Sequence, residues 1–178
     1  MGASGFGSTK PIISSQQATP ARRVSWVHPA RTALAAVASM LVARLLRLPE
    51  PYWAPITTLV IAQSSLGAAW EVSKQRFLGT LLGAIVGSIT ALSFGAHSQL
   101  AWLVVAFTVG VFLLGLICQL VRVDRSGYRF GGVTLTIVLL IPRTAPAWTI
   151  AFHRFVEVSI GIAVALVSAT LWPEKPEQ

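Results

Sequence analysis

Two ionisable residues lie three positions apart inside the last apolar run of the chain, Arg154 and Glu157. This spacing places both side chains on one face of a helix, where an ion pair lowers the cost of burying charge at membrane depth. Glu157 lies deeper in the run, and an acid in that position can also bind and release a proton. A proton carrier and a structural partner, either of Arg154 or of Arg44 and Arg47, are therefore alternatives for Glu157.

The dipeptide Arg-Phe opens two apolar runs, at Arg76-Phe77 and again 78 positions later at Arg154-Phe155. Further residues align at the same or nearly the same separation, so we interpret the chain as a duplication of one unit. The alternative is chance, because arginine caps many membrane helices. The other aligned pairs are Gly79 with Glu157, Gly83 with Gly161, Arg47 with Arg122, Tyr52 with Tyr128, and Thr57 with Thr134.

The composition indicates that a bilayer is the solvent of most of the chain. Of the 178 residues, 54% are hydrophobic and 11% are charged, whereas a soluble domain has about 25% charged residues. The net charge of +8 comes from cations scattered between apolar runs, which favours membrane topology over a nucleic-acid surface. The chain has one cysteine, no metal-ligand spacing and no catalytic motif, so we expect no enzyme, metal or cofactor.

Six apolar segments follow residues 1–30, a Gly-, Ser- and Pro-containing stretch that we interpret as a flexible tail. A spanning helix needs about 20 residues, and four segments reach or approach this length. Of the other two, one is short and one carries Arg44 and Arg47 in its last turn. The predicted segments are 32–48, 52–70, 77–94, 100–121, 130–142 and 150–172.

The predicted fold is an all-α membrane domain of six transmembrane helices over residues 31–173, followed by a short tail at 174–178. A duplicated unit of three helices enters the membrane in opposite orientations, which predicts two inverted three-helix repeats. With the N-terminus inside, ten of the 14 Lys and Arg residues fall on the cytoplasmic side. The positive-inside rule then places both termini in the cytoplasm.

Interrupted segments in matching positions of two repeats indicate where a transport pathway runs. Segment 52–70 contains Pro55, and segment 130–142 contains Gly131, Gly132 and Pro142. Their polar side chains are candidates for lining a pathway, and helix-to-helix hydrogen bonding is the alternative role for each one. These candidates are Thr57, Thr58, Gln63, Ser64, Ser65, Thr134 and Thr136.

Three glycines spaced four apart, Gly79, Gly83 and Gly87, lie along one face of the third predicted helix. Such a face lets another backbone approach closely. We therefore assign these glycines to helix packing, within the subunit or between two subunits. Gly161, the counterpart of Gly83, is assigned the same role.

Residues 49–87, PEPYWAPITTLVIAQSSLGAAWEVSKQRFLGTLLGAIVG, resemble the fusaric acid resistance (FUSC-like) membrane proteins. This family includes bacterial aromatic acid exporters and is similar to plant aluminium-activated malate channels. The resemblance covers residues 31–173. It rests on Tyr52-Trp53-Ala54-Pro55, on Arg76-x-x-Gly79-Thr80-x-x-Gly83, and on Arg154-x-x-Glu157-x-x-x-Gly161 with Leu171-Trp172-Pro173.

The resemblance implies a multi-pass inner-membrane transporter that exports small organic anions, often aromatic carboxylates, through a six-helix unit that pairs with a second copy. A passive anion channel and a non-transporting scaffold are the alternatives. Arginines at both mouths would draw anions into a cavity, although each arginine is alternatively an anchor at the membrane interface. The candidate pathway adds Arg44, Arg47, Trp53, Arg76, Arg154 and Glu157 to the polar residues named above.

Overall fold

The computed structural model describes residues 26–62, 65–94, 100–141 and 145–172, and all regular structure in these ranges is helical. The helices end near the turns and polar residues that separate the apolar runs of the sequence. The six helices are α1 (Val27–Leu45), α2 (Trp53–Ile61), α3 (Leu66–Phe94), α4 (Leu100–Leu120), α5 (Arg125–Leu140) and α6 (Ala147–Leu171).

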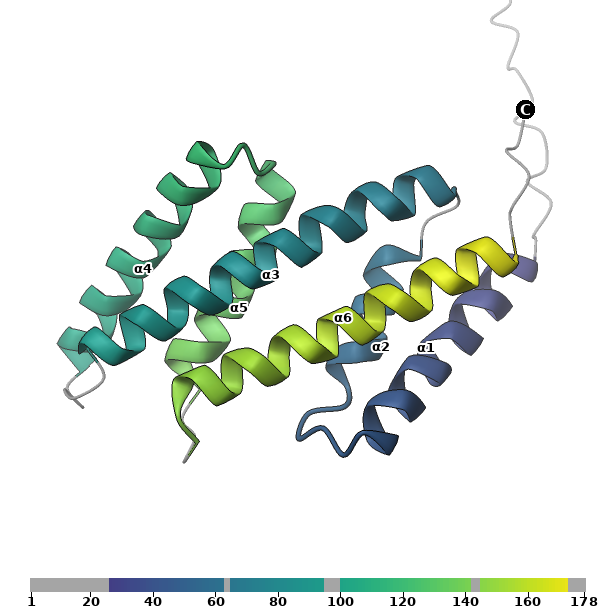
Figure 1. The fold of residues 1–178 in the computed structure, drawn as a ribbon, viewed down its shortest axis with the longest axis horizontal. Coiled ribbons are helices and arrows are strands. Elements are labelled where there is room, and N and C mark those ends of the chain that lie inside the picture. The colour runs from purple at the N-terminus through teal and green to yellow at the C-terminus, as the bar shows by residue number, and fades with distance from the viewer. Residues whose placement is uncertain (1–25, 63–64, 95–99, 142–144, 173–178) are drawn as a thin grey trace, which may run out of the picture.

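Two long helices, α3 and α6, form the centre of the molecule and run in opposite directions (Figure 1). Helices α4 and α5 lie on one side of this central pair, and α1 and α2 lie on the other. Helix α5 packs against α3 in the same way that α2 packs against α6, and α4 contacts α3 as α1 contacts α6. The pattern of neighbours is therefore unchanged when the first three helices are exchanged with the last three.

Three of the described helices are long and apolar enough to cross a membrane: α3, α4 and α6, with 29, 21 and 25 residues. Helices α1 and α5 have 19 and 16 residues. Helix α2 has nine, so its length of about 14 Å is roughly half the thickness of the hydrocarbon core.

The prediction of one helix over residues 52–70 is wrong, because α2 ends at Ile61 and α3 begins at Leu66. The Ser65 hydroxyl accepts a hydrogen bond from the Ala68 amide at 3.2 Å, which caps the new helix. The polar stretch after Trp70 forms a turn of helix in place of the expected loop. There, Lys74 lies 2.7 Å from the Glu71 carboxylate, a three-residue spacing that stabilises a helix.

The turns that follow α1 and α4 have the same backbone structure. Arg47 and Arg122 adopt left-handed φ angles of 53° and 60°, a conformation that non-glycine residues seldom take. In each turn, the next residue donates its amide to a carbonyl five positions back, as in a Schellman helix end. These hydrogen bonds join Leu48 to Ala43 at 3.1 Å and Val123 to Cys118 at 2.8 Å.

Glycines allow the closest helix crossings on both sides of the molecule. A Cβ atom at Gly83 would overlap the backbone of Gly131 in α5, and one at Gly161 would lie 2.5 Å from the Ala54 carbonyl oxygen in α2. Gly79 meets the Gly127 backbone in the same manner as Gly83 meets Gly131. Any larger residue at these positions would push α3 from α5 or α6 from α2.

The buried apolar residues form a cluster that joins α3, α5 and α6 and further clusters on either side of the central pair. One cluster joins α3, α4 and α5, and it contains Val86, Leu114, Cys118 and Leu135. Another joins α2, α3 and α6 through Ile61, Ala69 and Ala165. The outer surface holds many large exposed apolar side chains, including Phe112, Leu116 and Leu120 of α4.

Candidate anion-binding site

The two Arg-Phe dipeptides lie beside each other where α3 and α6 pack together. The rings of Phe77 and Phe155 lie in tilted contact, with 5.0 Å between their centroids and 59° between their planes. The two arginines lie close enough to interact electrostatically. We call the residues around them the arginine cluster, which consists of Arg76, Arg154, Glu157, Trp53, Thr57 and Phe130.

Arg154 is almost completely buried and has an acidic partner. One terminal nitrogen of its guanidinium lies 3.4 Å from the Glu157 carboxylate, and the two side chains are 2% and 0% exposed. The guanidinium carbon lies 3.6 Å from the centre of the Trp53 ring, a cation–π contact. The buried Nε of Arg154 has no hydrogen-bond partner within the described ranges.

Both carboxylate oxygens of Glu157 are engaged. One contacts Arg154, and the other accepts a hydrogen bond from the backbone amide of Glu50 at 3.2 Å. The Glu50 carboxylate in turn accepts hydrogen bonds from the Tyr52 hydroxyl at 2.9 Å and from the Trp53 indole at 3.1 Å. Glu157 thus joins α6 to the segment that leads into α2.

Arg76 is also buried, at 7% exposed, but it has neutral partners. Its Nε donates to the Thr57 hydroxyl at 3.2 Å, and its guanidinium carbon lies 4.7 Å from the centre of the Phe130 ring. No carboxylate among the described residues lies within ion-pair distance of Arg76. The cluster therefore holds one cation that is neutralised and one that is not.

The two arginine sites correspond through the internal alignment of the sequence. Arg76 and Arg154 are 78 positions apart, and their aromatic partners Trp53 and Phe130 are 77 apart. Glu157 is the exception to this correspondence. The aligned position in the first half of the sequence is Gly79, which has no acidic side chain. A side chain at Gly79 would collide with the carbonyl group of Gly127, so close packing of α3 on α5 excludes an acid there.

A buried guanidinium without a carboxylate can bind an anion. Removing a charge from water without a partner is costly, and a carboxylate ligand would restore both charge neutrality and hydrogen bonds. The aromatic rings of Phe130 and Trp53 flank the two guanidinium groups and offer apolar faces to an organic ligand. In the present conformation Arg76 and Arg154 are covered, so a ligand reaches them only after the helices move.

Several predicted pathway residues lie elsewhere. Arg44 and Arg47 are exposed at the end of α1, so neither is the partner of Glu157. The Thr58 hydroxyl lies within hydrogen-bond distance of the Ala54 and Gly161 carbonyl oxygens, at 3.1 and 3.2 Å, which is a helix-to-helix contact.

The threonines of α5 are turned toward their own helix. Thr134 and Thr136 donate to carbonyl oxygens one turn earlier, at Phe130 and Gly132, over 3.2 and 2.7 Å. Gln63 and Ser64 lie outside the described residues. Among the described hydroxyl and amide residues predicted to line a pathway, Thr57 is the one that belongs to the arginine cluster, through its hydrogen bond with Arg76.

The sequence interpretation missed two contributors to the site, Glu50 and Phe130. Phe130 aligns with Trp53 at 77 positions, so the internal repeat contained a signal for it. Glu50 acts through its backbone amide on Glu157, an interaction that has no residue-type signature.

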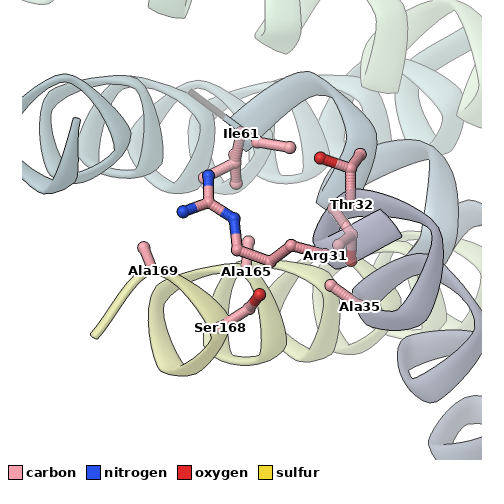
Figure 2. Close-up of a pocket in the computed structure, with 9 residues that line it drawn as sticks. Arg31, Thr32, Ala35, Ile61, Ala165, Ser168 and Ala169 are labelled. Atoms are coloured by element: carbon pink, nitrogen blue, oxygen red, sulfur yellow. The ribbon is translucent and has the colours of Figure 1, made fainter. Parts of the chain in front are cut away.

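A second buried arginine site, at the far end of α6, is structural. Arg31 of α1 is 7% exposed and donates to the Trp172 carbonyl oxygen at 2.7 Å. Figure 2 shows its side chain extending over the small residues Ala165 and Ala169 of α6, beside Ile61 of α2. The cavity here has a volume of only about 10 Å³, the space of a single water molecule. This arginine therefore ties α1 to the end of α6.

Comparisons with known proteins find similar bacterial proteins. The inner membrane protein YeeA of Escherichia coli (strain K12) is 33% identical over 154 residues, which cover 84% of this chain and 41% of YeeA. The uncharacterized transporter YdhK of the same strain is 27% identical over 151 residues, 77% of this chain and 21% of YdhK. The uncharacterized protein ORF2 of Neisseria gonorrhoeae is 26% identical over 151 residues, 83% of this chain and 34% of ORF2.

The chain spans less than half the length of each of these relatives. No solved structure matches it significantly. The model of the family described as "Fusaric acid resistance protein-like" matches residues 35–168, which confirms the resemblance seen in the sequence. The chain therefore belongs to the fusaric acid resistance protein-like family of membrane proteins.

Proposed function

We propose that this chain is a transport unit for small organic anions, with aromatic carboxylates as substrates and Arg76 as the main anion-binding residue. The observation that carries the proposal is the burial of Arg76 without a carboxylate partner. Arg154 in the equivalent position already has Glu157. A substrate carboxylate would supply to Arg76 what Glu157 supplies to Arg154.

The surroundings of the two arginines support an aromatic substrate. Phe130 and Trp53 each present a ring to a guanidinium group, and Phe77 and Phe155 follow the two arginines in sequence and contact each other. A planar ring that carries a carboxylate could stack on these faces while its oxygens bind the guanidinium. A small dicarboxylate such as malate gains the ionic contacts but not the stacking.

The arrangement of the helices supports a transporter built from inverted repeats. The neighbour pattern, the paired turns at Arg47 and Arg122, and the paired cation–π contacts each relate residues 75 to 78 positions apart. In transporters of this architecture, the substrate binds where the two repeats meet. The arginine cluster lies at this junction, between α3 and α6.

We propose the cytoplasmic placement of both termini and an outward direction of transport. The distribution of Lys and Arg favours this orientation. A monovalent anion that leaves a cell with a negative interior gains about 2.3 kcal/mol per 100 mV, so the membrane potential favours export.

A passive anion conduit is the second candidate function, and the bonding of Glu157 favours it. A proton carrier must release its partners, yet both oxygens of Glu157 are held, by Arg154 and by the Glu50 amide. Flux that survives collapse of the proton gradient would support the conduit. Flux that stops with the gradient would support a proton-coupled transporter.

The test is an uptake assay with the purified chain in liposomes. Hydroxybenzoates, fusaric acid and malate form the substrate panel, and protein-free liposomes are the control. We expect faster uptake of the aromatic acids than of malate, and light scattering in detergent would measure the proposed homodimer. An absence of flux for the whole panel, together with a partner protein that copurifies in fixed ratio, would support the scaffold alternative and refute the proposal.

A further inference from the structure

A groove between α4 and α5 lies on the surface of the molecule, apart from the arginine cluster. It has a volume of about 490 Å³ and is open along one side, and ligand sites typically enclose roughly 300–1,000 Å³. Its walls are formed by Val111, Phe112, Gly115, Leu116 and Tyr128, with Arg125 at one end.

The groove changes from apolar to polar along its length. Phe112 and Leu116 line it toward the middle of α4 and are 65% and 47% exposed. Gln119 and Arg125 line it near the turn between the helices. The distance along α4 from Val111 to Gln119 is about 12 Å. This polarity matches a ligand with an apolar chain and an anionic head.

The polar end of the groove has an excess of positive charge. Arg122, Arg125 and Arg129 are all exposed, and none of them has an ion pair with a described residue. Asp124 offsets only one of these three charges, and its carboxylate accepts a hydrogen bond from the side-chain amide of Gln75 at 2.8 Å. Arg122 also keeps a left-handed backbone conformation in a turn where glycine is favoured.

We infer that this groove binds an anionic phospholipid, with the headgroup phosphate at Arg125 and an acyl chain along Phe112, Gly115 and Leu116. Clustered arginines bind phosphate oxygens through charge-assisted hydrogen bonds. Basic pockets between membrane helices recognise lipid headgroups in this manner. Most of the apolar wall belongs to α4, which is less buried than the other two long apolar helices, α3 and α6.

The positive charge beside the groove favours an anionic lipid over a second copy of the chain as the occupant. A two-fold dimer through this groove would place the same surface patch of both copies together, and each copy would contribute Arg122, Arg125 and Arg129. The resulting repulsion opposes such an interface, whereas an anionic headgroup neutralises the patch.

The matching position in the other half of the sequence has a longer side chain. At the separation of 75 positions that relates the two turns, Met40 of α1 corresponds to Gly115 of α4. Gly115 lines the groove and contributes no side chain to it. A Cβ atom at Gly115 would lie 3.5 Å from the Tyr128 ring, an ordinary contact, so a methionine there can extend into the groove without displacing the backbone.

Two pairs of variants test the inference by native mass spectrometry of the purified full chain with added phosphatidylglycerol or phosphatidylcholine. Gly115→Met fills the groove, and its control is Gly132→Met, because a Cβ atom at Gly132 would meet open space. Arg125→Gln removes the headgroup contact, and its control is Arg47→Gln at the end of α1.

We expect wild-type protein to prefer phosphatidylglycerol at least tenfold, and Gly115→Met and Arg125→Gln each to weaken its binding about tenfold. The two control variants should bind as the wild type does. Equal binding of both lipids, or equal loss in test and control variants, would overturn the inference. So would a dimer that Gly115→Met converts to a monomer, since a second copy would then occupy the groove. If Gly115→Met does not fold, Arg125→Gln and Arg47→Gln decide the outcome.

Discussion

Arg76 and Arg154 occupy equivalent positions in the two halves of the molecule, yet their surroundings differ by one charge. Both are buried, and both lie against an aromatic ring from a helix of the other half. Arg154 has Glu157 one turn away, whereas Gly79 occupies the corresponding position on α3. Arg154 therefore holds the fold together through its ion pair, whereas Arg76 has no carboxylate partner among the described residues.

The cause of this difference is the packing of the backbone. Helix α3 approaches α5 so closely that a side chain at Gly79 would meet the Gly127 carbonyl group. At Glu157 the neighbour is the backbone amide of Glu50, a hydrogen-bond donor. One of the two aligned three-helix segments thus accommodates an acid, and the other excludes it. This asymmetry converts a symmetric framework into one with a single unneutralised site.

The largest expected effect is on stability, from Glu157→Gln. This change leaves Arg154 buried without its carboxylate, which we expect to lower the free energy of unfolding by about 3–5 kcal/mol. Thermal unfolding in detergent would measure the loss, and the double variant Arg154→Met/Glu157→Gln should recover most of it. A single variant as stable as wild type would show that the ion pair is not structural. If that stable variant also lost uphill transport, Glu157 would be a proton carrier.

The next effect is on transport, from Arg76→Gln. Loss of a charged hydrogen-bonding partner costs about 1.5–3 kcal/mol, so we expect uptake of aromatic carboxylates at low concentration to fall roughly 10- to 100-fold. Stability should hold or rise, because an unpaired buried charge is removed. Lys74→Gln, two residues earlier and exposed, is the matched control. Full uptake by Arg76→Gln would refute the assignment of the anion site.

A smaller effect distinguishes the two aromatic partners. Trp53→Leu removes the closer cation–π contact, at 3.6 Å, and Phe130→Leu removes the longer one, at 4.7 Å. We expect Trp53→Leu mainly to lower the melting temperature, by the equivalent of about 1–2 kcal/mol. Phe130→Leu should mainly weaken the preference for aromatic acids over malate in the uptake assay. If Trp53→Leu instead weakened the preference for aromatic acids and Phe130→Leu lowered the melting temperature, Arg154 would be the anion-binding residue and Arg76 the structural one.

The smallest expected effect is a gain in stability from replacing the left-handed residue in each of the two turns, and it should be equal for the turns after α1 and α4. Arg47→Gly and Arg122→Gly each relieve a left-handed backbone, which we expect to stabilise the protein by about 1 kcal/mol. Unfolding of the two single variants under the same conditions gives the comparison. A gain in one variant alone would show that the turns, although alike in hydrogen bonding, are under different tertiary constraint.

The sequence predicted the membrane character and the ion pair of Arg154 with Glu157. It also aligned Arg76-Phe77 with Arg154-Phe155, but the prediction of arginines at opposite mouths did not indicate that the two dipeptides lie beside each other. It did not indicate where α2 ends and α3 begins. Hydropathy alone joined residues on both sides of Ser65, and the charges after Trp70 suggested a loop, although Glu71 and Lys74 pair along one turn of helix. A search for helix caps would have favoured Ser65 as the start of α3.

The partners of the arginines were harder to predict, because they depend on how helices cross. Alignment of the two halves relates Trp53 to Phe130, but it does not show that each ring lies on the arginine of the opposite half. Nor does it show that Arg44 and Arg47 point away from Glu157. These contacts follow from the tertiary positions of glycines such as Gly83 and Gly161, whose close approaches fix the crossing points.

The contact between the tilted rings of Phe77 and Phe155 has a mechanical consequence. They are equivalent residues of the two halves, and they touch each other across the boundary between α3 and α6. A rocking motion of one half against the other would pivot at this contact, so a gap that widens on one side of the pivot must narrow on the opposite side. A pivot at these two aromatic rings would thereby keep the two ends of a transport pathway from opening at the same time.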